Sequence, residues 1–110
     1  MANVFMNAGG ALTTAYPGTP IYTSLAGKQS IVHSCIVSNV HASDSANVDI
    51  QATVDGGTTY YHVAKNVPIP SGSSLVIDKP IDLEPLDKIN LKASANSTLE
   101  CVLGILEITP

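Results

Sequence analysis

The alternation of apolar and polar positions predicts short β-strands and no helix. Apolar runs between Lys65 and Ser94 are brief, and Pro, Gly or Asp interrupts them every few residues, so no helical period survives there. At residues 48–54, apolar and polar side chains alternate, as they do in a strand with one buried face. Asp55, Gly56 and Gly57 follow, and glycine allows the positive φ that a hairpin turn needs.

Turn signals divide the chain from Thr19 onward into seven or eight strands. Residues 29–40 are apolar at so many positions that we expect a central strand covered on both faces. Gly104 inside the last run predicts a bulge or a close backbone approach. This spacing of strands predicts an all-β fold, an antiparallel β-sandwich of the jelly-roll or Ig-like type. The expected strands are residues 20–24, 29–40, 48–54, 58–67, 75–77, 81–83, 89–93 and 99–108, with 75–77 and 81–83 counted as one strand or two.

The first 18 residues differ in composition from the rest of the chain. They are rich in Ala, Gly, Thr and Asn, and Val4, Phe5 and Met6 form a small apolar cluster near the start. We therefore divide the chain into an extended N-terminal arm, residues 1–18, and a β-sandwich domain, residues 19–110. The arm is either a frayed tail or a segment that lies on a neighbouring subunit and buries Phe5 there.

Composition and charge exclude several classes of function. Charged residues make up 13% of the chain, against about 25% in an average soluble domain, so the surface suits contact with other proteins. Five Lys, no Arg, no Trp and a net charge of −4 argue against binding to nucleic acid. No apolar run approaches the roughly 20 residues of a membrane helix. The N-terminus has no signal-peptide pattern, so we expect folding in a reducing cytoplasm.

Histidine and cysteine are the residues that could carry chemistry. His33 and Cys35 are two positions apart and are predicted on one face of a strand, where His41, His62 and Cys101 could join them around zinc. The close Cys or His pairs that usually announce such a site are absent, and both cysteines lie in apolar strands that disfavour a thiolate. A disulfide between the two cysteines stays open. We expect no enzyme activity, no metal and no cofactor.

Acidic and aromatic residues have simpler interpretations. Asp44, Asp49 and Asp55 do not form the dense loop of carboxylates that calcium needs, so we expect turn-forming and solvated roles. Tyr60 and Tyr61 place one ring on each face of their strand. We expect one ring in the core, and the other exposed or anchoring an interface, with sugar binding as an alternative.

The order of several short motifs resembles a module of tailed-phage virion proteins. A Y-x-x-x-A-G-K start precedes an apolar strand that ends in Asn39, and a strand with a Gly-rich hairpin follows at residues 48–57. A V-P-I-P-x-G corner then occupies residues 67–72, before an L-x-x-G-D-type strand at residues 83–94 and a closing apolar strand. The match covers residues 20–108. One departure is Glu84-Pro85-Leu86, where the module has Gly before Asp87.

The resemblance implies a structural role without enzyme activity. Such proteins are small β-sandwich components of phage particles, which occur as capsid decoration or cement proteins and in necks, tails and fibres. The implied function is a decoration protein that stabilises the phage head, in a virion assembled in the bacterial cytoplasm. The implied partners are the major capsid protein or other virion proteins, and further copies in a homo-oligomer. A neck, tail or baseplate ring and a carbohydrate-binding module are the alternatives. The predicted contact residues are Phe5, Met6, His41, Asp44, Tyr60 and Tyr61.

Overall fold

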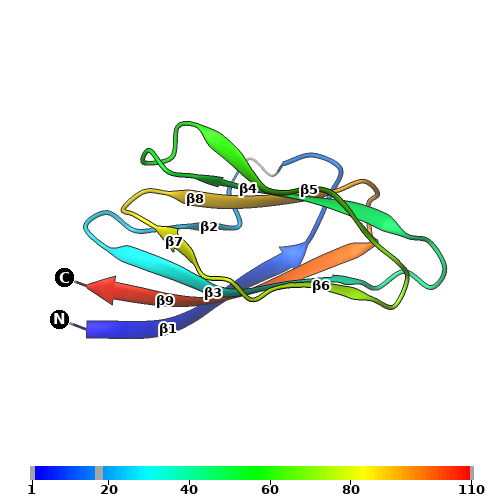
Figure 1. Ribbon diagram of the computed structural model, residues 1–110, viewed down its shortest axis with the longest axis horizontal. Helices are drawn as coiled ribbons and strands as arrows, with labels where there is room; N and C mark the ends of the chain where they lie inside the picture. The colour runs from blue at the N-terminus through cyan, green and yellow to red at the C-terminus, as the bar shows by residue number, and fades with distance from the viewer. Residues whose placement is uncertain (1, 17–18, 110) are drawn as a thin grey trace.

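The computed structural model describes residues 2–16 and 19–109, which form two antiparallel sheets stacked on each other (Figure 1). This confirms the predicted all-β sandwich. In the described part of the chain, no segment forms a helix of the length and apolar character needed to cross a membrane. The strands are β1 (Ala2–Ala11), β2 (Tyr22–Thr23), β3 (Gln29–Asn39), β4 (Ala46–Thr53), β5 (Tyr60–Ile69), β6 (Ser74–Ile77), β7 (Ile81–Leu83), β8 (Lys88–Ala93) and β9 (Leu99–Thr109).

The order of the strands identifies the sandwich as a jelly roll. The five-stranded sheet has the order β1-β9-β3-β6, and the four-stranded sheet has the order β2-β8-β4-β5. Strand β7 also pairs with β3, so that β7 and β6 occupy successive stretches of the same edge of β3. If β6 and β7 are counted as one interrupted strand, the fold has eight strands in two sheets of four, which is the jelly-roll pattern. The Ig-like alternative has a different strand order.

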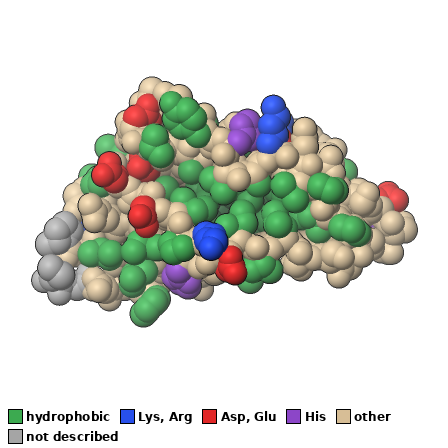
Figure 2. All heavy atoms as spheres, in the orientation of Figure 1, with side chains coloured by type: hydrophobic (Ala, Val, Ile, Leu, Met, Phe, Trp, Pro, Cys, Tyr) green, Lys and Arg blue, Asp and Glu red, His purple; other side chains and the backbone are tan. Residues whose placement is uncertain are grey.

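The core lies between the sheets and follows from the period of two in the strands. In β9, Leu99, Cys101, Leu103 and Ile105 point inward and are buried, while the residues between them point outward. Burial of each large aliphatic side chain contributes about 1.5–3 kcal/mol to folding. Figure 2 shows hydrophobic side chains along the middle of one side of the molecule, between the two layers. Partly buried apolar residues of β5, β6 and β7 also pack against the core.

The N-terminal segment is part of the sandwich. Strand β1 pairs with β9 of the same chain from Ala2 opposite Thr109 to Ala11 opposite Glu100, so the predicted arm starts as an edge strand. This strand accounts for the ninth strand beyond the predicted seven or eight. The sequence hid it because small residues, with little apolar signal, occupy much of its inner face. The residue after β1, Leu12, is buried in the core. Residues 1, 17 and 18 of the predicted arm lie outside the described residues.

Close contact between β1 and β9 yields a first prediction. A Cβ on Gly9 would clash with the carbonyl oxygen of Cys101, whereas a Cβ on Gly10 would meet no heavy atom within 4 Å. We expect Gly9→Ala to lower the free energy of unfolding by about 1–3 kcal/mol, and Gly10→Ala to change it by less than about 1 kcal/mol. Urea unfolding measures both. Equal effects of the two substitutions would contradict the pairing of β1 with β9.

The buried carboxylate of Asp87 joins two turns at one end of the sandwich. It accepts hydrogen bonds from the Thr53 hydroxyl at 3.2 Å, from the Gly56 amide at 2.8 Å and from the Glu84 amide at 3.0 Å. The β4–β5 hairpin and the turn between β7 and β8 are thereby tied together. In the same turn, Leu86 has a φ of 70°, a left-handed conformation that a residue with a Cβ adopts at a cost.

Leu86 stands where the resembled module has Gly, and this supplies a second prediction. Glycine adopts a positive φ without the steric cost that any Cβ incurs. We therefore expect Leu86→Gly to be more stable than Leu86→Ala by about 1 kcal/mol, because both remove the same exposed side chain and only Ala keeps the strain. Thermal unfolding of both variants tests this. An alanine variant as stable as the glycine variant would show that the turn carries no such strain.

Candidate protein interaction surface

The outward-facing side of the five-stranded sheet carries two rows of apolar side chains across the strands. We call this side the outer apolar face. Its most exposed members are Phe5, with 78% of its surface accessible, and Val76 and Val102, each with 58%. The face of an antiparallel sheet that contacts water usually carries polar and charged side chains instead. By strand register, the rows are Phe5–Leu106–Ile31 and Val102–Ile36–Val76.

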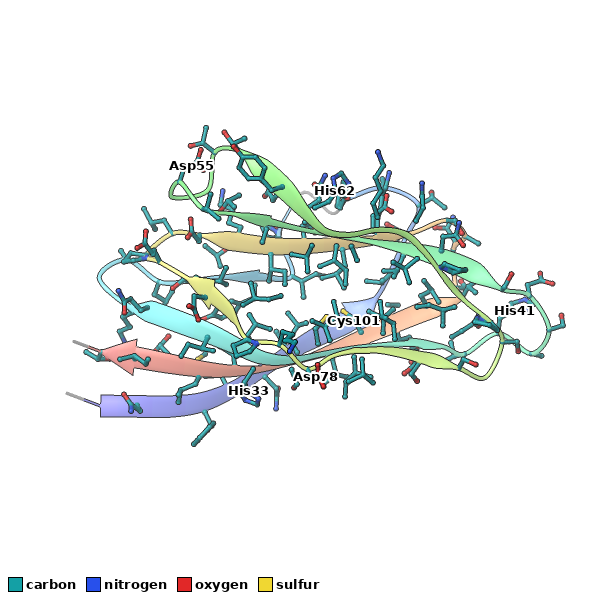
Figure 3. All side chains as sticks on the ribbon, in the orientation of Figure 1. His33, His41, Asp55, His62, Asp78 and Cys101 are labelled. Carbon is teal, nitrogen blue, oxygen red and sulfur yellow. The ribbon has the colours of Figure 1, made fainter. Side chains whose placement is uncertain are left out.

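A bulge in β3 shapes the surface between the two rows. The register against β9 shifts between Val32 and Ser34, which leaves His33 as the extra residue. His33 covers Gly104, where a Cβ would lie 2.6 Å from its Cε1 atom, and its ring meets that of Phe5 edge-on at 6.1 Å. An irregularity was predicted at Gly104 in the last strand; the extra residue lies opposite it in β3, and the atoms that approach Gly104 are those of the His33 and Ser34 side chains. Figure 3 shows His33 on the outside of this layer.

The bulge also corrects the predicted pairing of His33 with Cys35. A strict alternation would put residues two apart on one face, but the extra residue reverses the phase of the strand. His33 is exposed, whereas Cys35 is buried in the core. The two side chains therefore cannot ligate one metal ion. Among residues 2–16 and 19–109, no group of three or more His, Cys, Asp or Glu side chains is arranged to hold a metal.

The outward-facing side of the four-stranded sheet is polar by contrast. Along β4, outward positions carry Asn47, Asp49 and Gln51, and β8 presents Lys88 and Lys92. The Lys92 ammonium lies 3.7 Å from an oxygen of the Asp49 carboxylate, whose other oxygen accepts the Asn66 amide at 2.6 Å. The four-stranded sheet therefore presents a row of polar and charged side chains along β4 and β8, whereas the five-stranded sheet presents apolar rows, beside which Asp82 and Glu100 are exposed.

Strand β3 differs most from the environment that its sequence predicted. Its sequence predicted cover on both faces, but the second sheet covers only the inner one. On the outer face, Ile31 is half-buried and Ile36 is 37% exposed. A strand that is apolar on both sides is usual where both faces are buried. The two rows of the outer apolar face therefore have the composition of a covered surface and are uncovered in the single chain.

The six predicted contact residues lie in three separate places. Phe5 is on the outer apolar face, and Met6, the next residue of β1, is also exposed. Tyr60 and Tyr61 are on β5 of the other sheet, whereas His41 lies in the loop between β3 and β4, at the end of the molecule opposite Asp55 (Figure 3). The structure does not bring these residues together. Only Phe5 joins the apolar rows. Sequence reasoning missed Ile36 because its strand was expected to be covered on both faces, and it missed Val76 and Val102 because a short apolar run does not show which of its faces is uncovered.

The loop that holds His41 and Asp44 is fixed by a buried asparagine. The side-chain nitrogen Nδ2 of Asn39 donates to the backbone carbonyls of Asp44 at 2.9 Å and Ile69 at 2.8 Å. Its side-chain oxygen Oδ1 accepts a hydrogen bond from the backbone amide of His41. Nδ1 of His41 in turn accepts the Asp44 amide at 3.0 Å. The Asp44 side chain itself is exposed. The loop is thus held in one shape, and a contact role for it stays a prediction.

The tyrosine pair lies on the edge strand β5. Tyr60 is half-buried and Tyr61 is 59% exposed, opposite Thr53 and Ala52 of β4 respectively. Because the two residues are adjacent on one strand, their rings point to different sides of the sheet. They do not form one joint aromatic platform. Sugar binding or an interface role for Tyr61 stays a prediction.

Both cysteines are free and buried in the core, and Figure 3 shows Cys101 between the sheets. Burial raises the pKa of the Cys35 thiol to about 12, and the nearby Cys101 thiol adds to the rise. Burial also raises the pKa of Cys101, partly offset by a hydrogen bond from the Gly10 backbone. Since the thiolate is the reactive form, both side chains act as small apolar groups at neutral pH.

The raised pKa of Cys35 predicts a loss of stability in alkali. The folded state favours the neutral thiol. The contribution of Cys35 to the free energy of unfolding is therefore fully present below the pKa of the unfolded state, about 9, and is lost as the pH rises toward 12. We expect the unfolding free energy to fall by up to about 1.4 kcal/mol per pH unit more steeply in the wild type than in Cys35→Ala over this range. Urea titrations between pH 8 and 11 measure the difference. Parallel curves would contradict the assignment.

Comparison with known proteins supports the fold and extends no further. No protein-family model and no curated protein matches the sequence. A chain in the structure of infectious bursal disease virus, Gx strain, superposes with a TM-score of 0.56 at 11% identity, over 96% of this chain and 32% of that one. For a chain from the Gt strain of the same virus, the fractions covered are the same, at 11% identity with a TM-score of 0.48. This chain thus spans about a third of the viral chain, and the likeness concerns the fold alone.

Proposed function

We propose that this protein is a structural component of a virus particle, and specifically a decoration or cement protein that stabilises a phage head. The observation that carries the proposal is the outer apolar face, in which β3 and its neighbours expose two in-register apolar rows. Burying such a surface against a shell protein supplies the free energy that holds the two together. The jelly-roll fold, which also occurs in viral capsid domains, supports this role.

The proposed mode of action is mechanical. Two stacked sheets form a rigid body, and seating its apolar face across neighbouring shell subunits adds to the work needed to separate them. The low charge of the chain favours close packing among other proteins. The proposed partner is the major capsid protein or another virion protein. The proposal assigns no catalytic role.

A charge on the outer apolar face tests the proposal. We expect Val102→Asp to weaken co-sedimentation of the protein with particles of the virus that encodes it by at least about tenfold, because a buried unpaired carboxylate is strongly unfavourable. Val54→Asp is the matched control, since Val54 is 64% exposed and lies at the end of β4, away from this face. Circular dichroism checks that both variants fold.

Equal binding of the two variants would contradict the role of the outer apolar face, and absence of the protein from purified particles would contradict a virion role altogether. Copy number then separates a head protein from the alternative ring of a neck, tail or baseplate. A decoration protein occurs in roughly hundreds of copies per particle, whereas a ring of cyclic symmetry holds about six or twelve. Quantitative mass spectrometry of purified particles measures this number.

A further inference from the structure

Strand β1 has a free edge whose hydrogen-bonding groups can be assigned. The Leu12 amide donates to the Leu99 carbonyl at 2.9 Å, so these opposed residues are a hydrogen-bonded pair. Such pairs alternate along an antiparallel ladder, which directs the even-numbered residues of β1 toward β9. In the described part of the chain, β1 pairs with β9 alone. The backbone amides and carbonyls that face away from β9, with no strand partner, are those of Asn3, Phe5, Asn7, Gly9 and Ala11.

The other three sheet edges carry features that prevent strand addition. Strand β2 is two residues long. Strand β5 has two register shifts and contains Lys65 and Pro68. The edge formed by β6 and β7 is broken by Asp78, Lys79 and Pro80. Short strands, bulges, lysine and proline are the usual means by which proteins block pairing at an edge.

Strand β1 has none of these protections. It is ten residues long, it carries no charged residue and no proline, and its register with β9 is continuous. An edge of this kind is a template for pairing with another strand. One edge of the four is therefore left open, in the strand that also displays the exposed Phe5.

We propose that the β1 edge pairs with the β1 edge of a second copy of this chain, antiparallel about a two-fold axis. The two five-stranded sheets then form one continuous sheet of ten strands. In the antiparallel arrangement, the free amides of each copy face the free carbonyls of the other. Because each chain has one open edge, the pairing closes at two copies and does not grow into a filament.

Two observations favour a second copy over another occupant. First, β1 carries no charged residue, so two identical strands can pair without electrostatic repulsion. A charged strand of another protein would find no charge on β1 to attract it. Second, the outer apolar face of one chain is small. With strands about 4.8 Å apart and a rise of about 3.3 Å per residue, its two rows span about 300 Å². A specific interface buries about 800 Å² per partner.

Pairing through β1 would enlarge this surface. Side chains on the same side of two paired strands lie on one face, so the outer apolar faces of both copies become continuous and Phe5 lies at their junction. The pair presents about 600 Å², close to the lower end of specific interfaces. The dimer is thus a more complete docking surface than the single chain. Self-pairing is measured on the isolated protein, so its outcome is independent of any virion role.

Analytical ultracentrifugation of the full chain tests the proposal. We expect the wild type to dimerise reversibly and Asn7→Pro to raise the dissociation constant by at least about tenfold. Proline at this position removes an amide that faces the partner and leaves the hydrogen bonds to β9 intact. Ser74→Pro is the matched control, because the Asn39 amide donates to the Ser73 carbonyl, which directs the Ser74 amide to the free side of β6. The control is expected to dimerise like the wild type.

Further variants keep the test decisive. If Asn7→Pro does not fold, Asn7→Lys replaces it, since two lysines near the two-fold axis repel each other and the loss of dimer is reversed by salt. Of the single variants Asn3→Cys, Phe5→Cys and Asn7→Cys, the one nearest the two-fold axis is expected to form an intermolecular disulfide, while the buried native cysteines stay unreactive. A monomeric wild type at about millimolar concentration overturns the proposal, as does an unchanged dimer in the Asn7 variants or no cross-link at any of the three positions.

Discussion

The pairing of β9 with its two neighbours is the interaction on which the rest of the structure depends. The last strand of the chain lies between β1 and β3, pairs with both over nearly its whole length and supplies alternate buried residues to the core. It brings Ala2 opposite Thr109, so the two ends of the chain meet in one sheet. Such long-range contacts are assembled against a large loss of chain entropy. The first strand, the outer apolar face and the open edge therefore all exist only after the last strand is in place.

A single irregularity in this pairing connects the core to the surface. The bulge at His33 changes the phase of β3, which keeps Cys35 and Val37 inside while Ile31 and Ile36 face outward. Gly104 accommodates the bulge because a Cβ there would meet the His33 and Ser34 side chains. The same feature separates the two apolar rows and places the His33 ring against Phe5. A local deviation from strict pairing thus defines both the packing of the interior and the shape of the proposed docking face.

The two sheets differ in what they present to their surroundings. The four-stranded sheet carries Asp49, Lys88 and Lys92 on its outward side, and the five-stranded sheet carries aliphatic residues and Phe5. Exposed apolar surface of this kind favours association with other molecules. The difference between the two sheets therefore supports the proposed assembly role, as does an edge strand that lacks the protection found at the other edges.

The sequence by itself determined the all-β class, most strand positions and the turns, because apolar alternation and turn residues act over a few neighbouring positions. It located the hairpin at Gly56 and Gly57, and it indicated a backbone irregularity at Gly104. The resemblance highlighted Asn39, which proved to hold the loop of His41 through three hydrogen bonds. The tertiary structure alone decided that β1 belongs to the sheet, because its small residues carry little pattern and its partner lies about a hundred residues away in the chain. It also decided which face of β3 is covered. An apolar strand has the same sequence whether its second face is covered by its own chain or by another, and only the positions of the sheets distinguish the two.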